Sequence, residues 1–248
     1  MSFISAGSKY IVTGATSGIG KAVVEALLEN SATVLGIGRE ADKVTAITES
    51  YPQTFEFHSL DLCQLELIEQ VLSNYIDINK FDGLIHCAGR DETTPLAMCN
   101  EHNISSLFKI NVFSGIELLR VFYKKRFSND GYSVIFISSV MAELGQQGKI
   151  GYCATKAAIT GVVRAASLEL TKRRIRVNAI SPAIVISPMS DTLLAGTSHD
   201  EFTEIKKMHP TGFGTTQDVV PMILFLLSEN SKWITGQNIK IDGGYSIK

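Results

Sequence analysis

KYIVTGATSGIGKAVVEALLEN, residues 9–30, indicates the fold of this chain more clearly than any other stretch. An apolar run rich in β-branched residues leads into a glycine-rich turn and then into an amphipathic helix. Gly14 can make the tight turn, Gly18 lets the backbone approach a pyrophosphate, and Gly20 lets helix and strand pack closely. The start of a helix also attracts phosphate through its free amides and dipole. The stretch predicts a dinucleotide-binding unit, with a merely structural turn as the alternative. The residues expected at the phosphates are Gly14, Thr16, Ser17, Gly18, Ile19 and Gly20.

The rest of the chain continues the pattern of this first unit. Apolar strand-like runs alternate with helix-period segments up to IRVNAISP, residues 175–182. Such alternation predicts βαβ units, and continuous apolar strands predict helices on both faces of the sheet. We therefore expect an α/β, doubly wound Rossmann fold with a mostly parallel seven-stranded sheet, forming one domain over residues 1–248. Residues 187–212 are expected to form a mobile flap over a ligand, with a plain surface excursion as the alternative.

Composition excludes several classes of function. The formal charge of −2 offers no basic face for nucleic acid, and no apolar run is long enough to span a membrane. The chain begins without a secretory signal pattern, so we expect a cytoplasmic protein. Its four cysteines form no C-x-x-C pair, and we expect no metal site.

The end of the second strand bears on the choice of nucleotide. NAD binding usually places an acidic residue there, but this chain has Gly38 followed by Arg39. Because a guanidinium can bind a 2′-phosphate through a charge-assisted fork, we expect NADP(H) rather than NAD(H). Arg39 as a solvated residue is the alternative. Further nucleotide contacts are expected after the third and fourth strands, although both stretches could equally be turns. These contacts are Asp61, Leu62, Ala88 and Gly89.

Tyr152 and Lys156 lie one helical turn apart and should share a face of their helix. A phenol with a pKa of about 10 needs a pKa lower by about three units to exchange protons near neutrality. The charge of Lys156 at about 4 Å would supply a shift of that size. Ser139, at the end of an earlier strand, could polarise the same substrate oxygen. Taken alone, a Tyr–Lys pair on a helix is more often a solvated face than a site.

Together the glycine cradle, the serine and the Tyr-x-x-x-Lys motif resemble the short-chain dehydrogenase/reductase family over nearly the whole chain. The resemblance implies that Asn111, in KINVFSG, is a fourth catalytic residue whose side chain holds a water in a proton relay through Lys156. It also implies that Lys156 binds the nicotinamide ribose. The remaining cofactor residues that it implies are Tyr152, Pro182, Val185 and Ser187.

Three departures from the family pattern are visible. His86 and Cys87 stand where the family has two asparagines, and Ala183 stands where glycine is usual. Ser187 stands where a threonine is usual, a change that keeps the hydroxyl. We interpret His86 as a satisfied buried imidazole rather than a catalytic histidine. Ala183 restricts the backbone and could reshape the pocket.

The resemblance implies reversible hydride transfer between NADPH and a ketone, giving a secondary alcohol. Among family members the chain looks most like the 3-oxoacyl-carrier-protein reductases, and basic clusters at 124–126 and 172–174 could bind an acidic carrier protein. The alternatives are a reductase of a small polar ketone or sugar, and a non-enzymatic NADP-sensing protein. The family also implies a homotetramer or homodimer joined through helices at about 105–127 and 151–172 and through the C-terminal strand. The pocket wall is expected to contain Met141, Glu143, Leu144, Gln146 and Gln147.

Overall fold

The computed structural model describes residues 3–76 and 80–247. One parallel sheet organises them, with the strand order β3-β2-β1-β4-β5-β6-β7. The prediction of a doubly wound α/β fold is confirmed, and the sheet is parallel throughout these residues. The strands are β1 (Lys9–Thr13), β2 (Thr33–Gly38), β3 (Phe55–Ser59), β4 (Phe81–His86), β5 (Ser128–Ile137), β6 (Arg176–Pro182) and β7 (Asn238–Ile241).

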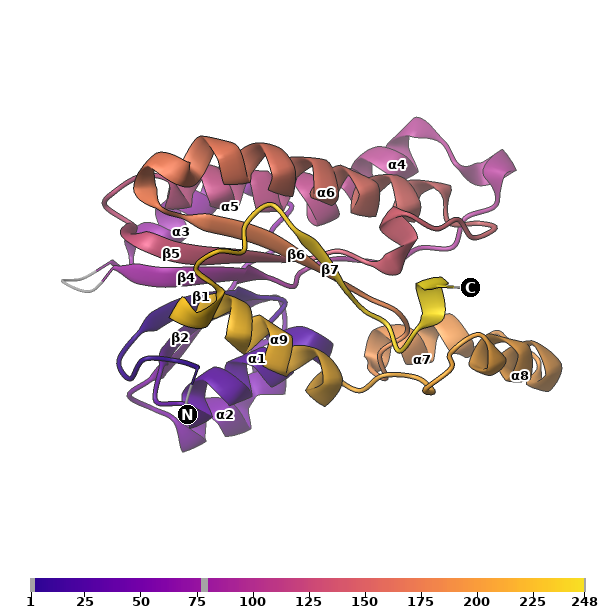
Figure 1. Cartoon of the computed structure of the whole chain (residues 1–248), viewed down its shortest axis with the longest axis horizontal. Helices are drawn as coiled ribbons and strands as arrows, with labels where there is room; N and C mark the ends of the chain where they lie inside the picture. Colours follow the sequence, from indigo (N-terminus) through magenta and orange to yellow (C-terminus); the bar gives the residue numbers. More distant parts are fainter. Residues whose placement is uncertain (1–2, 77–79, 248) are drawn as a thin grey trace.

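The helices of the α/β body divide between the two faces of the sheet (Figure 1). Those on one face are α1 (Gly18–Glu29), α2 (Thr45–Ser50) and α9 (Thr216–Leu227). Those on the other are α3 (Ile68–Ser73), α4 (Glu101–Phe108), α5 (Ser114–Phe122) and α6 (Ile150–Glu169). Because both faces are covered, central strands such as β1 are buried along their whole length.

The predicted helix at 105–127 is interrupted in the structure. α4 and α5 are joined by a π-helical turn, Lys109–Phe113, which contains the buried Asn111. Single π-turns within helices are rare and occur frequently at functional sites. This turn places Asn111 beside the loop that follows β4.

The segment predicted as a flap contains two helices, α7 (Pro188–Leu194) and α8 (His199–Lys207). Both lie beyond the carboxyl ends of the strands, away from the main body of helices (Figure 1). Their starts are well specified, because Ser187 and Ser198 each form a capping box.

Two absences concern the described ranges alone. Within residues 3–76 and 80–247, no helix is long and apolar enough to cross a membrane. No group of three or more His, Cys, Asp or Glu residues in those ranges is arranged to hold a metal ion.

Candidate active site

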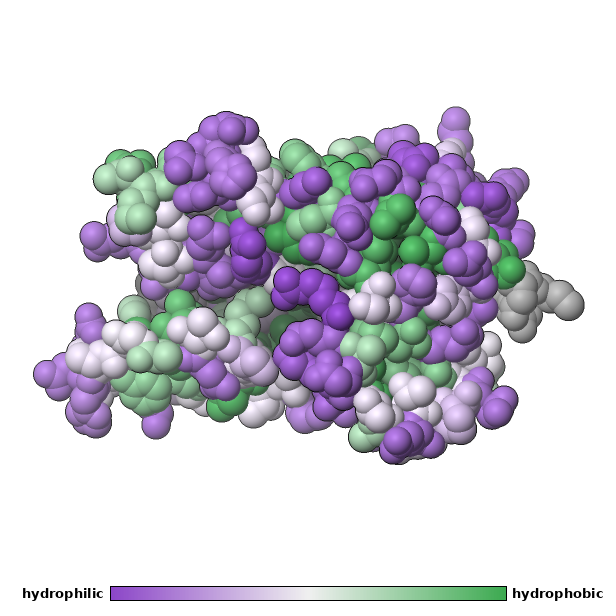
Figure 2. Space-filling model, turned by 180° about the vertical axis from the view of Figure 1, so that it is seen from behind, coloured by the Kyte–Doolittle hydropathy of each residue, from purple (hydrophilic) through white to green (hydrophobic). Residues whose placement is uncertain are grey.

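A cavity of about 420 Å³ lies at the carboxyl ends of the strands. Its walls come from the loops after β1, β4, β5 and β6, from the start of α6, and from the α7–α8 segment. In the space-filling view the molecule is hollowed between the α7–α8 segment and the rest of the chain (Figure 2). This is where parallel α/β sheets bind their ligands.

The glycine turn after β1 has the geometry of a phosphate cradle. Gly14 adopts φ +67°, and a Cβ on Gly20 would lie 2.2 Å from the Gly14 carbonyl oxygen. Neither position could therefore hold a larger residue without moving backbone. Ser17, the N-cap of α1, makes no side-chain cap, so the first amides of the helix keep their hydrogen-bonding capacity for an anion. These features fit the pyrophosphate of a dinucleotide.

The predicted cofactor residues separate into two groups. The members that line the cavity are Gly14, Ser17, Gly18, Ile19, Gly20, Ala88, Gly89, Tyr152, Lys156, Pro182, Val185 and Ser187. Thr16, Arg39, Asp61 and Leu62 lie outside it. Arg39 is exposed just beyond β2, whereas Asp61 accepts a hydrogen bond from the Cys63 amide and so caps its own turn.

His86 connects the central strands to the helix layer. Its Nδ1 lies 2.9 Å from the Thr13 hydroxyl, which accepts a hydrogen bond from the Ala88 amide, and its Nε2 lies 3.3 Å from the Ser114 hydroxyl. Burial lowers the pKa of His86 to about 3, so the imidazole stays neutral. The interpretation of His86 as a satisfied core histidine is confirmed, and it braces the sheet where the family has asparagine.

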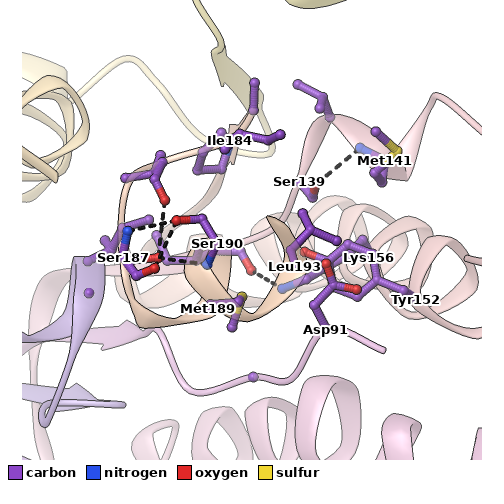
Figure 3. Close-up of a pocket in the computed structure, with 18 of the residues that line it drawn as sticks. Asp91, Ser139, Met141, Tyr152, Lys156, Ile184, Ser187, Met189, Ser190 and Leu193 are labelled. Carbon is purple, nitrogen blue, oxygen red and sulfur yellow. Dashed lines mark hydrogen bonds between the residues drawn. The ribbon is translucent and has the colours of Figure 1, made fainter. Parts of the chain in front are cut away.

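Ser139, Tyr152 and Lys156 meet at one end of the cavity (Figure 3). All three are buried, and the Lys156 Nζ lies 5.6 Å from the centre of the Tyr152 ring. That ammonium donates a hydrogen bond to the Ile137 carbonyl oxygen over 2.8 Å. The residues therefore converge although Ser139 comes from the end of β5 and the other two come from α6.

The expected fall in the pKa of Tyr152 is not found in the structure. Burial raises the pKa of the phenol well above its usual value; the Asp91 carboxylate adds to the rise, and the Ser139 hydroxyl opposes it. Desolvation is the largest cause, because the tyrosinate anion would form at a buried position. Tyr152 is consequently protonated near neutral pH, as a proton donor must be.

The pKa of Lys156 is shifted downward, and this shift predicts that activity depends on pH. Burial lowers its pKa to about 8, against an opposing effect of Asp91. The ammonium form exists below that pH, so kcat/KM for ketone reduction should fall about tenfold per unit as pH rises above 8. The expected control is Lys156→Arg, whose residual activity should lack this alkaline limb because a guanidinium stays charged. A limb near pH 10 in the unmodified protein would contradict the assignment.

Asn111 holds the loop after β4. Its Oδ1 accepts from the Arg90 amide at 2.7 Å, and its Nδ2 donates to the Arg90 carbonyl oxygen and to the Thr155 hydroxyl, both at 3.0 Å. Both amide hydrogens are thus donated within the protein. These bonds fix the loop after β4, and the role of Asn111 in holding a relay water stays a prediction.

The loop after β6 closes the cavity opposite Tyr152. Ser187 exchanges hydrogen bonds with Ser190 and packs against Gly18, where a Cβ would lie 3.4 Å from the Ser187 Cβ (Figure 3). Val185 pairs with Gly214 in an isolated parallel bridge. Ala183 has no positive φ, so replacing the family's glycine causes no backbone strain.

The predicted wall after Ser139 is only partly correct. Met141 and Gln146 line the cavity, whereas Glu143 forms an ion pair with Lys240 at 2.6 Å. Sequence reasoning missed the contributions of Asp91 and Lys149, although each lies close in sequence to a recognised motif. Further lining residues that it missed are Thr93, Met189, Leu193, Leu194, Ile205, Met208, His209 and Tyr245.

Comparison with known proteins identifies the family. A family model described as enoyl-(acyl carrier protein) reductase matches residues 14–246. A solved short-chain dehydrogenase family protein from Francisella tularensis is 29% identical, with a TM-score of 0.86 over 98% of this chain and 100% of that one. The chain belongs to the short-chain dehydrogenase/reductase family.

Two curated relatives have names that state different activities. The 3-oxoacyl-[acyl-carrier-protein] reductase FabG of Thermotoga maritima is 29% identical over 97% of this chain and 98% of the relative. The NAD-dependent glycerol dehydrogenase of Listeria innocua is also 29% identical, over 96% of each. The chain is therefore an oxidoreductase of this family, and equal identities favour neither substrate.

Proposed function

We propose that this protein interconverts a ketone and a secondary alcohol, with NADP(H) as the cofactor and Tyr152 as the general acid and base. The convergence of Ser139, Tyr152 and Lys156 on a cavity that contains the glycine cradle is the observation that carries the proposal. When bound, a nicotinamide cofactor supplies the hydride for reduction and takes it up in oxidation.

The chain's own residues would handle the substrate oxygen. The Ser139 hydroxyl donates a hydrogen bond to the carbonyl oxygen and orients it. The Tyr152 hydroxyl donates its proton to that oxygen as negative charge develops there, and the positive charge of Lys156 stabilises the resulting tyrosinate. Asn111 supports this arrangement indirectly through Arg90 and Thr155, which flank the site.

Arg39 supports the preference for NADP(H). It is exposed just past the end of β2, with Gly38 beside it, and the nearest acidic residue, Glu40, pairs with Lys43 at 2.8 Å. Its exposure, and the pairing of the neighbouring Glu40 carboxylate with Lys43, support binding of a 2′-phosphate by this guanidinium.

The substrate has two candidates, and surface charge favours one of them. Reduction of a carrier-linked 3-oxoacyl group would use the basic clusters, but Lys124 and Arg126 both pair with Glu69 at 2.6 Å. Arg173 is buried and bonded to Asp130. Because three of the six basic side chains in these clusters are engaged in ion pairs within the protein, we favour a small free ketone as the substrate.

A spectrophotometric panel tests the function. NADPH oxidation is followed with an acetoacetyl thioester, a cyclic ketone and a hydroxy ketone, with NADH in parallel. We expect turnover of a free ketone and a preference for NADPH. Thioester turnover alone would restore the carrier-linked substrate, and tight NADPH binding without any turnover would support the NADP-sensing alternative.

We also propose a homotetramer or homodimer joined through α4, α5 and α6. Large apolar side chains on α5 and α6 are exposed, including Ile116 at 42% and Leu168 at 80%. Apolar exposure of this kind is typical of a surface that a partner covers. Sedimentation at micromolar concentration measures the assembly.

A further inference from the structure

A mostly buried ion pair lies in the cavity wall beside the proposed proton donor. The Lys149 Nζ lies 2.6 Å from the Asp91 Oδ1, and the two side chains are only 3% and 14% exposed. Asp91 comes from the loop after β4, and Lys149 immediately precedes α6. Both residues line the cavity, so the pair joins two walls of one site.

The pair is close to the reacting group. The Lys149 Nζ lies 5.7 Å from the centre of the Tyr152 ring, nearly the same distance as the Lys156 Nζ. Asp91 lies next to Tyr152 in the close-up (Figure 3). Asp91, Lys149 and Tyr152 line the same cavity, so a substrate whose carbonyl is held by Tyr152 shares that space with the pair.

The two charges keep unused hydrogen-bonding capacity. An ammonium has three donors and a carboxylate has about four acceptor sites. Within the described residues, the bond between them is the single hydrogen bond that either charged group makes. Taking two charges out of water is unfavourable unless further bonds satisfy their remaining sites. A ligand group that both donates and accepts would meet this requirement.

The charge balance of the pair narrows the choice of ligand. A substrate carboxylate would be attracted by Lys149 but repelled by Asp91 at the same place. An alkyl group would leave both charges unsatisfied. A hydroxyl can accept from Lys149 and donate to Asp91 at once, because it carries both a lone pair and a proton.

We propose that Asp91 and Lys149 bind a hydroxyl on the carbon next to the reacting carbonyl, which makes α-hydroxy ketones and the corresponding vicinal diols the substrate class. This inference rests on the proposed ketone reduction and specifies its substrate. The bound hydroxyl is unchanged in the reaction. The carbonyl carbon receives the hydride from NADPH, its oxygen receives the proton of Tyr152, and the products are a vicinal diol and NADP⁺.

The kinetic test uses hydroxyacetone and butanone, which are matched in size and differ in a hydroxyl against a methyl group. We expect kcat/KM with NADPH to favour hydroxyacetone about 100-fold, since hydrogen bonds to charged groups are worth about 10- to 150-fold each. In the double variant Asp91→Asn/Lys149→Met this ratio should fall at least about tenfold. The double change avoids leaving one buried charge without its partner.

A conservative variant separates hydroxyl binding from a structural role. Asp91→Asn/Lys149→Gln keeps a donor and an acceptor without charge, so it should retain more of the preference for hydroxyacetone than the Asn/Met variant. Equal losses of kcat/KM on both ketones in both double variants would overturn the proposal, because an ion pair with a purely structural role would affect the two substrates alike.

A binding measurement keeps the proposal testable without turnover. Ligand-observed NMR on the NADP⁺-bound protein compares the Kd of propane-1,2-diol with that of butan-2-ol. We expect tighter binding of the diol, weakened about tenfold in the Asn/Met variant. If neither ketone is reduced but this difference persists, the proposed function fails and the hydroxyl site stands. If the variant binds the diol as the unmodified protein does, the hydroxyl site is refuted.

Discussion

Tyr152→Phe is expected to lower kcat for ketone reduction by about 1,000-fold, within the range of about 10²–10⁴ that general acid catalysis contributes. The variant keeps the aromatic ring, which is buried, and loses only the proton that the substrate oxygen must receive. The Kd for NADPH should change by less than about threefold, since the ring still fills its place in the wall. Single-turnover kinetics and fluorescence titration with NADPH measure the two quantities separately.

Tyr123→Phe is the matched control for this variant. Tyr123 is 48% exposed at the end of α5, so loss of its hydroxyl should leave kcat unchanged. If Tyr152→Phe kept more than about a tenth of the activity, the phenol would not be the proton donor. A water or another hydroxyl near Ser139 would then have to replace it.

Arg39→Ala is expected to lower kcat/KM about 10- to 100-fold with NADPH and to change it little with NADH. The reason is that a charge-assisted fork to a phosphate is worth about 1.5–3 kcal/mol, and NADH has no 2′-phosphate to lose. Steady-state kinetics with each cofactor at a fixed ketone concentration measure the two effects.

Arg39→Lys is the conservative variant in the same series. It keeps the charge but loses the planar fork, so its loss with NADPH should lie between those of the unmodified protein and Arg39→Ala. A loss that is the same for NADPH and NADH would show that Arg39 serves the structure of the loop after β2. The proposed preference for NADP(H) would then lack a residue that binds the 2′-phosphate.

Much of the fold could be predicted because its signals are local. The glycine spacing from Gly14 to Gly20 and the continuous apolar runs can each be recognised within a short stretch of sequence. The structure has the predicted helix after the glycine turn and the predicted parallel pairing of the strands. The interruption at Lys109–Phe113 was not predicted, because a single wider turn with i→i+5 bonds is too short to be recognised in the apolar pattern of the surrounding helix.

The candidate site was only partly predictable. Tyr152 and Lys156 share a helical face through their spacing alone, so their proximity followed from the sequence. The pKa values did not, because desolvation depends on how completely the rest of the chain buries each group. Arg173 likewise looked like a surface cation until the fold paired it with Asp130.

By itself, the sequence indicated the family, through motifs spread along the chain, and it predicted the phosphate-binding turn and the proton donor, since each of these two predictions depends on residues within one short segment. Only the tertiary structure decided that Asn111 bonds to Arg90 and that Asp91 meets Lys149 beside Tyr152. These contacts join segments far apart in the chain. Their distances and dielectric surroundings arise from packing of the whole sheet and its helices, which no local spacing encodes.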